Sequence, residues 1–345
     1  MEKEKFSERF KLTGEQKDFD FVDIKLWTDQ AFFIDPSLIV KAQHEETKKG
    51  FDEAAYATRA HKELQSFFSR FFDEFKNINP TELVNSAGPG AKGIEREEKI
   101  LDLLKYSSEN DALHLGLTKK ESKGTGCSPE MIYDFFANMK FKHSYMFDFI
   151  REPFHVTGFI DEIGKDRSTD LTVSIILDVL CDYTLSVCKE YGIEQSQPEK
   201  MGDFEQYRHY WHSNEEKWET RDYKLPIDEY GKPIILVPKS FVTKDFKYSA
   251  KYIMNHYILK EKEKEHKIKN PSIRWVKSVG RRKLRAEFDG FSDKGIVLEY
   301  FKKYPELYGR FMEQLNHGIL GTHPGLLTDE EIEKETNMPI EDVEN

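Results

Sequence analysis

The strongest hydrophobic pattern in this 345-residue chain is a phenylalanine-rich stripe within residues 51–78. Its apolar positions recur at spacings of three and four, the period of one face of an α-helix. These positions are Leu64, Phe67, Phe68, Phe71, Phe72 and Phe75. The pattern predicts one long helix whose stripe packs in the core or against a partner helix.

The most apolar helical run lies between Phe154 and Ile193 and follows a short acidic stretch. Further helices are indicated by capping signals, because Asp or Ser accepts from free N–H groups and Pro suits the first helical position. These starts are Asp35-Pro36, Ser128-Pro129 before 131–150, and Ser292-Asp293 before a helix through Phe301 that Pro305 interrupts or restarts. Another helix is predicted over residues 246–269.

Short apolar or alternating runs predict a few strands. They are 19–24, 31–34, and a hairpin of 223–227 and 234–238 around the turn 228–233. Residues 207–212 read as an aromatic helix, on which His209 and His212 would share one face as an incomplete zinc pair. The expected fold is α+β, mostly helical with a small mixed β-sheet.

A polar break at 194–200, containing Pro198, is the preferred internal boundary. It separates an N-terminal α-rich domain (1–193), carrying a candidate acidic site, from a C-terminal α+β region (201–327) with the hairpin and a basic segment. An acidic tail (328–345) follows, and we expect the core not to need it.

Composition narrows the functional classes. A net charge of −11 excludes a protein coated in phosphate-binding charge, but a local basic groove remains compatible with it because salt screens charge over about 10 Å. Three cysteines without a CxxC pattern suggest reduced thiols, and the charged start MEKEKFSERF lacks the apolar region of a signal peptide. No apolar run reaches the roughly 18 residues of a membrane span. We therefore expect a cytoplasmic protein with no membrane association.

Four acids stand at the start of the apolar run, with Arg167 among them: Asp161, Glu162, Asp166 and Asp170. Carboxylates that converge on Mg²⁺ support phosphodiester cleavage, and Asp166 and Asp170, four apart, would share a helical face as metal ligands. Arg167 would hold a phosphate oxygen. The alternative is structural, because acids in a first turn stabilise a helix, and Ser168 or Thr169 suits capping equally well.

Two further stretches predict anion binding. A glycine turn before the helix at Ser128 has lysines beside it, a pattern suited to phosphate or to a solvated turn. Its candidate residues are Lys119, Lys120, Lys123, Gly124 and Gly126. A basic stretch with an aromatic that can stack suits a nucleic-acid backbone and its bases, or an acidic partner protein. Its residues are Arg274, Trp275, Lys277, Arg281, Arg282, Lys283 and Arg285.

Short blocks across the chain resemble uncharacterised bacterial proteins found near restriction and phage-defence genes. The blocks are Phe33-Ile34-Asp35-Pro36, His114-Leu115-Gly116 with Lys123-Gly124-Thr125-Gly126, Asp166 to Leu171, and Ile235 to Lys239. The resemblance implies no catalytic residue and favours a nucleic-acid-directed role.

Two hypotheses follow. The first is a Mg²⁺-dependent nuclease or nuclease-like effector, acting in antiviral defence. The second is a non-catalytic subunit of a multiprotein defence assembly, or a homo-oligomer, which binds a partner protein or nucleic acid.

Overall fold

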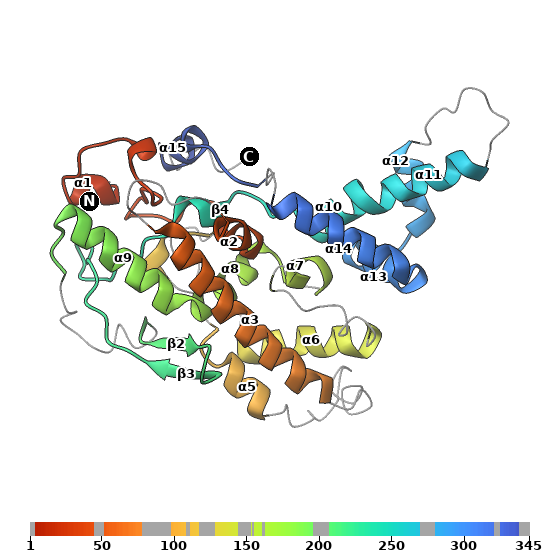
Figure 1. Ribbon diagram of the computed structural model, residues 1–345, viewed down its shortest axis with the longest axis horizontal. Coiled ribbons are helices and arrows are strands. Elements are labelled where there is room, and N and C mark those ends of the chain that lie inside the picture. The colour runs from red at the N-terminus through yellow and green to blue at the C-terminus, as the bar shows by residue number, and fades with distance from the viewer. Residues whose placement is uncertain are drawn as a thin grey trace.

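Helices dominate the fold. A computed structural model describes residues 4–44, 52–77, 98–107, 111–116, 128–143, 153, 155–160, 163–195, 207–269, 280–320 and 325–337. These parts confirm a mostly helical α+β fold, in which the strands form two separate antiparallel pairs (Figure 1). The helices are α1 (Phe6–Arg9), α2 (Pro36–Ala42), α3 (Glu53–Asn77), α5 (Glu98–Leu104), α6 (Pro129–His143), α7 (His155–Phe159), α8 (Lys165–Ile175), α9 (Leu177–Tyr191), α10 (Ala250–Ile253), α11 (Leu259–Lys269), α12 (Arg281–Arg285), α13 (Asp293–Lys303), α14 (Pro305–Leu320) and α15 (Asp329–Asn337).

The long helix predicted from the phenylalanine stripe is α3, and its stripe is buried as expected. Phe67 meets Trp211 edge to face, with ring centroids 5.1 Å apart, and Phe71 meets Phe136 of α6 at 4.6 Å. Edge-to-face pairs of this kind add to the stability that comes from area burial. The stripe is therefore the centre of the core.

The capping signals are also confirmed. The Asp35 carboxylate accepts from the Ser37 N–H at 2.8 Å before α2. The Ser128 hydroxyl accepts from the Met131 N–H at 3.2 Å before α6, and Ser292 accepts from Gly295 at 3.1 Å before α13. Each cap satisfies an N–H group that has no partner inside its own helix.

The apolar run ending at Ile193 is two helices and not one. α8 and α9 meet at Ile176 with a bend of 75°. Near the bend, the Ser174 hydroxyl donates to the Asp170 carbonyl at 2.9 Å, a back-bond that often bends helices. α9 ends at Gly192, which has the left-handed conformation (φ 67°) that glycine adopts at low cost.

The strands are β1 (Phe33–Ile34), paired with β4 (Val242–Thr243), and β2 (His209–His212), paired with β3 (Lys217–Thr220). The helix predicted over 207–212 is wrong, because this segment is β2, in which Trp211 pairs across to Trp218. Residues 19–24 are buried except for Asp20, but they form only an isolated bridge, between Phe21 and Pro238.

The predicted hairpin is a tight reversal with a single bridge between Ile227 and Pro233. The Asp228 carboxylate closes it by accepting from the N–H groups of Tyr230 and Lys232, both at 2.8 Å. Beyond this turn, the Ile235 N–H donates to the Ala112 carbonyl and the Leu236 N–H donates to the Thr184 hydroxyl, both at 2.9 Å. The flanking segments therefore do not extend into a paired ladder.

Figure 1 shows α10 to α14 as a helical lobe that extends from a larger body containing α3, α8, α9 and both strand pairs. A π-helical segment (Met254–Ile258) joins α10 to α11, so one long helix crosses the lobe. Buried apolar residues from the body and from this lobe belong to one hydrophobic cluster. No single described helix has the length and hydropathy to cross a membrane, although the bent pair α8–α9 satisfies both criteria together.

The expectation that the acidic tail does not contribute to the core is wrong for α15. Ile332 of this helix is 1% exposed and belongs to the core. Asp329 pairs with Lys239 at 2.8 Å, and Glu335 pairs with Lys244 at 2.7 Å. In Figure 1, α15 lies beside the N-terminal segments, so this C-terminal helix packs against the beginning of the fold.

Candidate anion-binding pocket

The start of α8 is anchored to the larger body by β1. The Thr169 hydroxyl accepts from the Ile34 N–H at 3.1 Å and donates to the Lys165 carbonyl at 2.8 Å. The Lys165 ammonium lies 4.4 Å from the centroid of the Phe33 ring. Thr169 therefore joins α8 to a strand and does not cap the helix.

Of the four predicted acids, Asp166 and Asp170 lie on α8, both partly buried, whereas Asp161 and Glu162 lie outside the described residues. Asp166 lies beside Gly116, since its Oδ1 is 3.3 Å from the position a Cβ on Gly116 would occupy. Gly116 also has a φ of 132°, which disfavours other residues. Gly116, which precedes the glycine and lysine stretch, therefore lies next to Asp166 of the acidic stretch.

The remaining residues of that predicted loop cannot be placed: Lys119, Lys120, Lys123, Gly124 and Gly126 lie outside the described residues. The Arg167 guanidinium lies 5.2 Å from the centroid of the Phe135 ring of α6. This cation–π contact gives Arg167 a role in packing α8 against α6.

The basic stretch is described in part. Arg274, Trp275 and Lys277 lie outside the described residues, whereas residues 281–285 form α12. Arg282 and Lys283 are exposed, and Arg285 donates to Asp293 of α13 at 2.5 Å. Arg281 belongs to the first turn of α12.

Arg285 and the start of α8 meet in one cavity of about 560 Å³, which lies between the larger body and the helical lobe. The cavity also includes the starts of α10 and α13. Its charged lining comprises four basic and two acidic side chains: Lys165, Lys251, Arg285, Lys294, Asp245 and Asp293. We refer to it as the cationic pocket.

Fixed partners position the basic side chains of the cationic pocket. Lys165 donates to the Lys244 carbonyl at 2.9 Å and lies 3.5 Å from the Asp245 carboxylate. Lys294 donates to the Ile160 carbonyl and, at 2.8 Å, to the Ile163 carbonyl just before α8. These contacts hold both ammonium groups at the entrance of α8.

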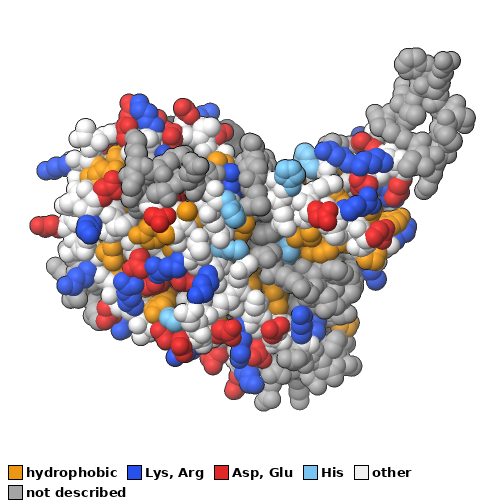
Figure 2. All heavy atoms as spheres, viewed as in Figure 1, with side chains coloured by type: hydrophobic (Ala, Val, Ile, Leu, Met, Phe, Trp, Pro, Cys, Tyr) orange, Lys and Arg blue, Asp and Glu red, His pale blue; other side chains and the backbone are white. Residues whose placement is uncertain are grey.

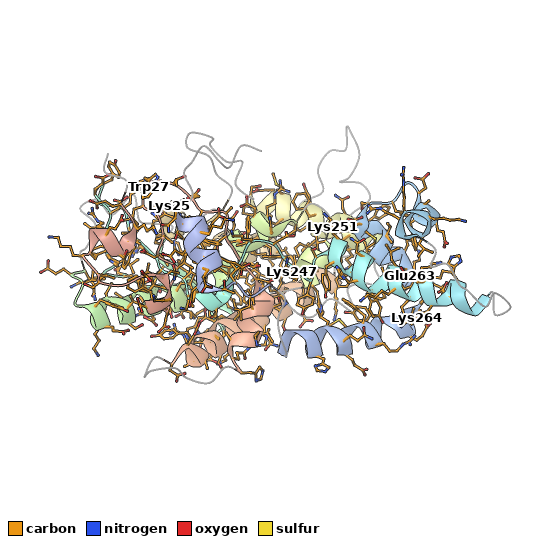
Figure 3. The ribbon with its side chains drawn as sticks, turned by 90° about the horizontal axis from the view of Figure 1, so that it is seen from above. Lys25, Trp27, Lys247, Lys251, Glu263 and Lys264 are labelled. Carbon is orange, nitrogen blue, oxygen red and sulfur yellow. The ribbon has the colours of Figure 1, made fainter. Side chains whose placement is uncertain are left out.

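Lys251 differs from the other three cations. It is exposed on the first turn of α10 and forms no salt bridge with any residue that the structure describes. Figure 3 shows Lys247 and Lys251 at this end of the long α10–α11 helix, with Glu263 and Lys264 farther along it. The exposed Lys251 ammonium group therefore has no described carboxylate that a ligand would have to displace.

Backbone groups add to the positive potential. Neither Gly164 before α8 nor Ser249 before α10 makes a side-chain cap, so the first N–H groups of both helices lack that acceptor. Helix N-termini favour anions through these N–H groups and the helix dipole. Together with a lining of net charge +2, they make phosphate the natural ligand class.

Asp166 and Asp170 have no third metal ligand among the described His, Cys, Asp and Glu side chains. Among the residues described, no group of three His, Cys, Asp or Glu side chains is arranged to hold a metal ion. His209 and His212 are three apart on strand β2, which puts them on opposite faces. His209 stacks on Tyr106 at 3.7 Å, and the His212 Nδ1 accepts from the Glu215 N–H, so the predicted zinc pair is wrong.

A second charged cluster, between α3 and α9, was not predicted. Arg59 donates to Asp178 and, at 2.7 Å, to Asp182. Arg221 donates to the same two carboxylates at 2.7 and 2.8 Å. Glu63, one turn from Arg59, is buried, and its Oε2 has no hydrogen-bond partner in the described structure.

Burial raises the pKa of Glu63 to about 8, with Arg59 lowering it and Asp178 and Asp182 raising it. Three carboxyl groups face two guanidinium groups here, so a protonated Glu63 leaves the cluster neutral. The two guanidinium groups pair with Asp178 and Asp182, so the cluster joins α3 to α9. Its members come from residues 59–63, 178–182 and 221, which no local pattern connects.

Comparison with known proteins identifies a matching family. A family model described as a domain of unknown function (DUF8370) matches residues 11–249. The search of curated proteins and the search of solved structures each found no match. The matched region contains the α8 side of the cationic pocket, with Gly164 and Lys165, and ends before Lys251, Arg285 and Lys294.

Proposed function

We propose that this chain, which belongs to the DUF8370 family, binds the phosphate groups of a nucleic acid in the cationic pocket. The observation that carries the proposal is the convergence of four basic side chains, from both the body and the helical lobe, at the starts of three helices. In a protein of net charge −11, this local excess of positive charge is the feature that favours an anionic ligand.

The physical basis is electrostatic. Phosphate contacts supply most sequence-independent affinity for nucleic acid, and each one releases counterions, so binding weakens as salt rises. The net negative charge of the chain opposes binding elsewhere on its surface, so contact is restricted to a local positive site. The cavity of about 560 Å³ is also large enough to hold a phosphate with its sugar.

Measuring the affinity of the protein for single-stranded and duplex DNA and RNA at several salt concentrations tests the proposal. Lys251→Glu should weaken binding about tenfold at about 50 mM salt and reduce the salt slope by roughly one. Lys264→Glu is the matched control, because Lys264 is exposed on the same long helix and pairs only locally, with Glu261. Equal affinities for the two variants, or no binding at low salt, would overturn the proposal.

The source of the phosphate is decided by competition. Inorganic phosphate and a nucleoside triphosphate should displace a labelled oligonucleotide only at much higher concentration than an unlabelled oligonucleotide does. If the triphosphate competes better than the oligonucleotide, the pocket is a nucleotide site and not a nucleic-acid site.

Metal-dependent cleavage is the second candidate function. It is favoured by Asp166 and Asp170, two carboxylates one turn apart on the helix whose first residue lines the cationic pocket. Cleavage with Mg²⁺, its loss with EDTA, and its loss in Asp166→Asn/Asp170→Asn protein are the expected results. Cleavage that survives both substitutions refutes this assignment.

Binding without cleavage, together with co-purification of a fixed partner, would favour the alternative role of a non-catalytic subunit of a multiprotein assembly. The resemblance to bacterial proteins found near restriction and phage-defence genes favours an antiviral setting for either role. The two described cysteines, Cys181 and Cys188, are buried free thiols, which suits the reducing cytoplasm. A plaque assay with and without the gene tests the defence role.

A further inference from the structure

A second cavity, of about 530 Å³, lies in the helical lobe between α11, α13 and the segment after α12 that contains Phe288 and Phe291. We call it the aromatic cleft. Aromatic and basic side chains line the cleft, among them Phe288, Phe291, Tyr304, Lys262, Lys302 and Lys303. Figure 2 shows hydrophobic and basic side chains side by side over this lobe.

Phe291 is the unusual member, because its side chain is 52% exposed in a chain that buries most of its aromatics. Its ring lies against the first turn of α13, since its Cδ1 is 3.3 Å from the position a Cβ on Gly295 would occupy. Gly290, with a φ of 87°, makes the turn that presents the ring. An exposed ring that lines a cavity offers an apolar face on which a flat ligand can stack.

The charged side chains around the aromatic cleft restrict which class of ligand it can bind. The Lys303 ammonium lies 5.2 Å from the Tyr304 ring centroid, and Lys302 is exposed beside it. Lys262 lies 5.6 Å from the Phe288 ring and pairs with Glu287 at 3.0 Å. Glu299 is the one acidic residue in the lining. Aromatic faces among cations fit a flat, polyanionic ligand.

The aromatic cleft and the cationic pocket are neighbours. Phe291 lines the cleft, and the next residue, Ser292, lines the pocket. Both side chains flank Gly295, each with an atom 3.3 Å from its Cβ position. One ligand can therefore reach both sites across the start of α13.

We infer that the aromatic cleft stacks unpaired bases of a single nucleic-acid strand whose phosphates occupy the cationic pocket, so the chain prefers single strands to duplex. This inference rests on the proposed function. Bases within a duplex are already stacked and paired, so they offer no free face to Phe291. Base–aromatic stacking is tolerant of sequence, and little sequence preference is expected.

Phe291→Ala tests the inference with the full chain. The substitution removes one stacking face, so affinity for a single-stranded oligonucleotide should fall about tenfold, while duplex affinity stays within twofold. Phe291→Trp retains a stacking face and should retain single-strand affinity. Phe141→Ala, which removes another exposed ring outside the cleft, is the control and should change neither affinity.

The outcomes separate the two proposals. If Phe291→Ala leaves single-strand affinity unchanged while Lys251→Glu weakens it, the cleft holds no base and the pocket proposal stands. If Phe291→Ala weakens single-strand and duplex binding equally, the preference for single strands is refuted. If Lys251→Glu has no effect on either ligand, the proposed function itself fails.

Discussion

Replacing Glu63 with Gln should stabilise the protein at high pH. Glu63 is buried between α3 and α9, and its pKa is raised to about 8, so the folded protein keeps it protonated at neutral pH. In the unfolded chain the same carboxyl ionises near its ordinary pKa of 4.5. The stability that the protonated group contributes is therefore fully present below pH 4.5, declines above it, and is lost once the pH passes about 8.

The magnitude follows from the two pKa values. One pKa unit corresponds to about 1.4 kcal/mol, so the interval from 4.5 to about 8 sets an upper limit of about 5 kcal/mol. The side chain is only 7% exposed, which leaves little solvent to screen the charge. Gln cannot ionise, so the stability of Glu63→Gln relative to the wild type should rise by about 2–4 kcal/mol between pH 5 and pH 9.

Urea denaturation of both proteins at several pH values measures this difference. Glu74→Gln is the control, because Glu74 lies on the same helix and pairs with Arg70 at 2.8 Å in a more exposed position. An exposed pair of this kind contributes about 0.5 kcal/mol or less. If the difference in unfolding free energy between Glu63→Gln and the wild type stays constant from pH 5 to pH 9, Glu63 is ionised in the folded protein. That result would refute the reasoning.

Three further predictions concern stability, each measured as the change in unfolding free energy. Thr169→Val should cost about 1–3 kcal/mol, because it leaves the buried Ile34 N–H without its acceptor, whereas Thr169→Ser should cost much less; equal costs would contradict this role. Asp35→Ala should cost about 1 kcal/mol through loss of the α2 cap, and Asp35→Asn should preserve most of the cap. Ile332→Ala should cost about 2–4 kcal/mol, since this side chain is 1% exposed, and a neutral result would mean that α15 does not pack in solution.

Prediction of the candidate site from sequence succeeded only in part. The acidic stretch and the basic stretch were each recognised from local composition, and the structure brings Arg285 to the first turn of α8. Lys251 and Lys294 were missed because each is a single lysine in an ordinary helix start. Phe291 was missed for a related reason, since no local pattern distinguishes an exposed phenylalanine from a buried one.

The sequence by itself determined the features that depend on a few neighbouring residues. The α3 stripe and the caps at Asp35, Ser128 and Ser292 are of this kind, because periodicity and side-chain acceptance act within one or two turns. Residues 207–212 show the limit of such reasoning, since an aromatic segment that suits a helix becomes a strand when Trp218 is available across from Trp211.

Only the tertiary structure decided which charged groups meet. The Glu63 cluster joins three distant segments, and the cationic pocket joins the body to the helical lobe. Electrostatic interactions act through space over about 10 Å in salt, so their partners are set by the packing of whole helices and not by spacing along the chain.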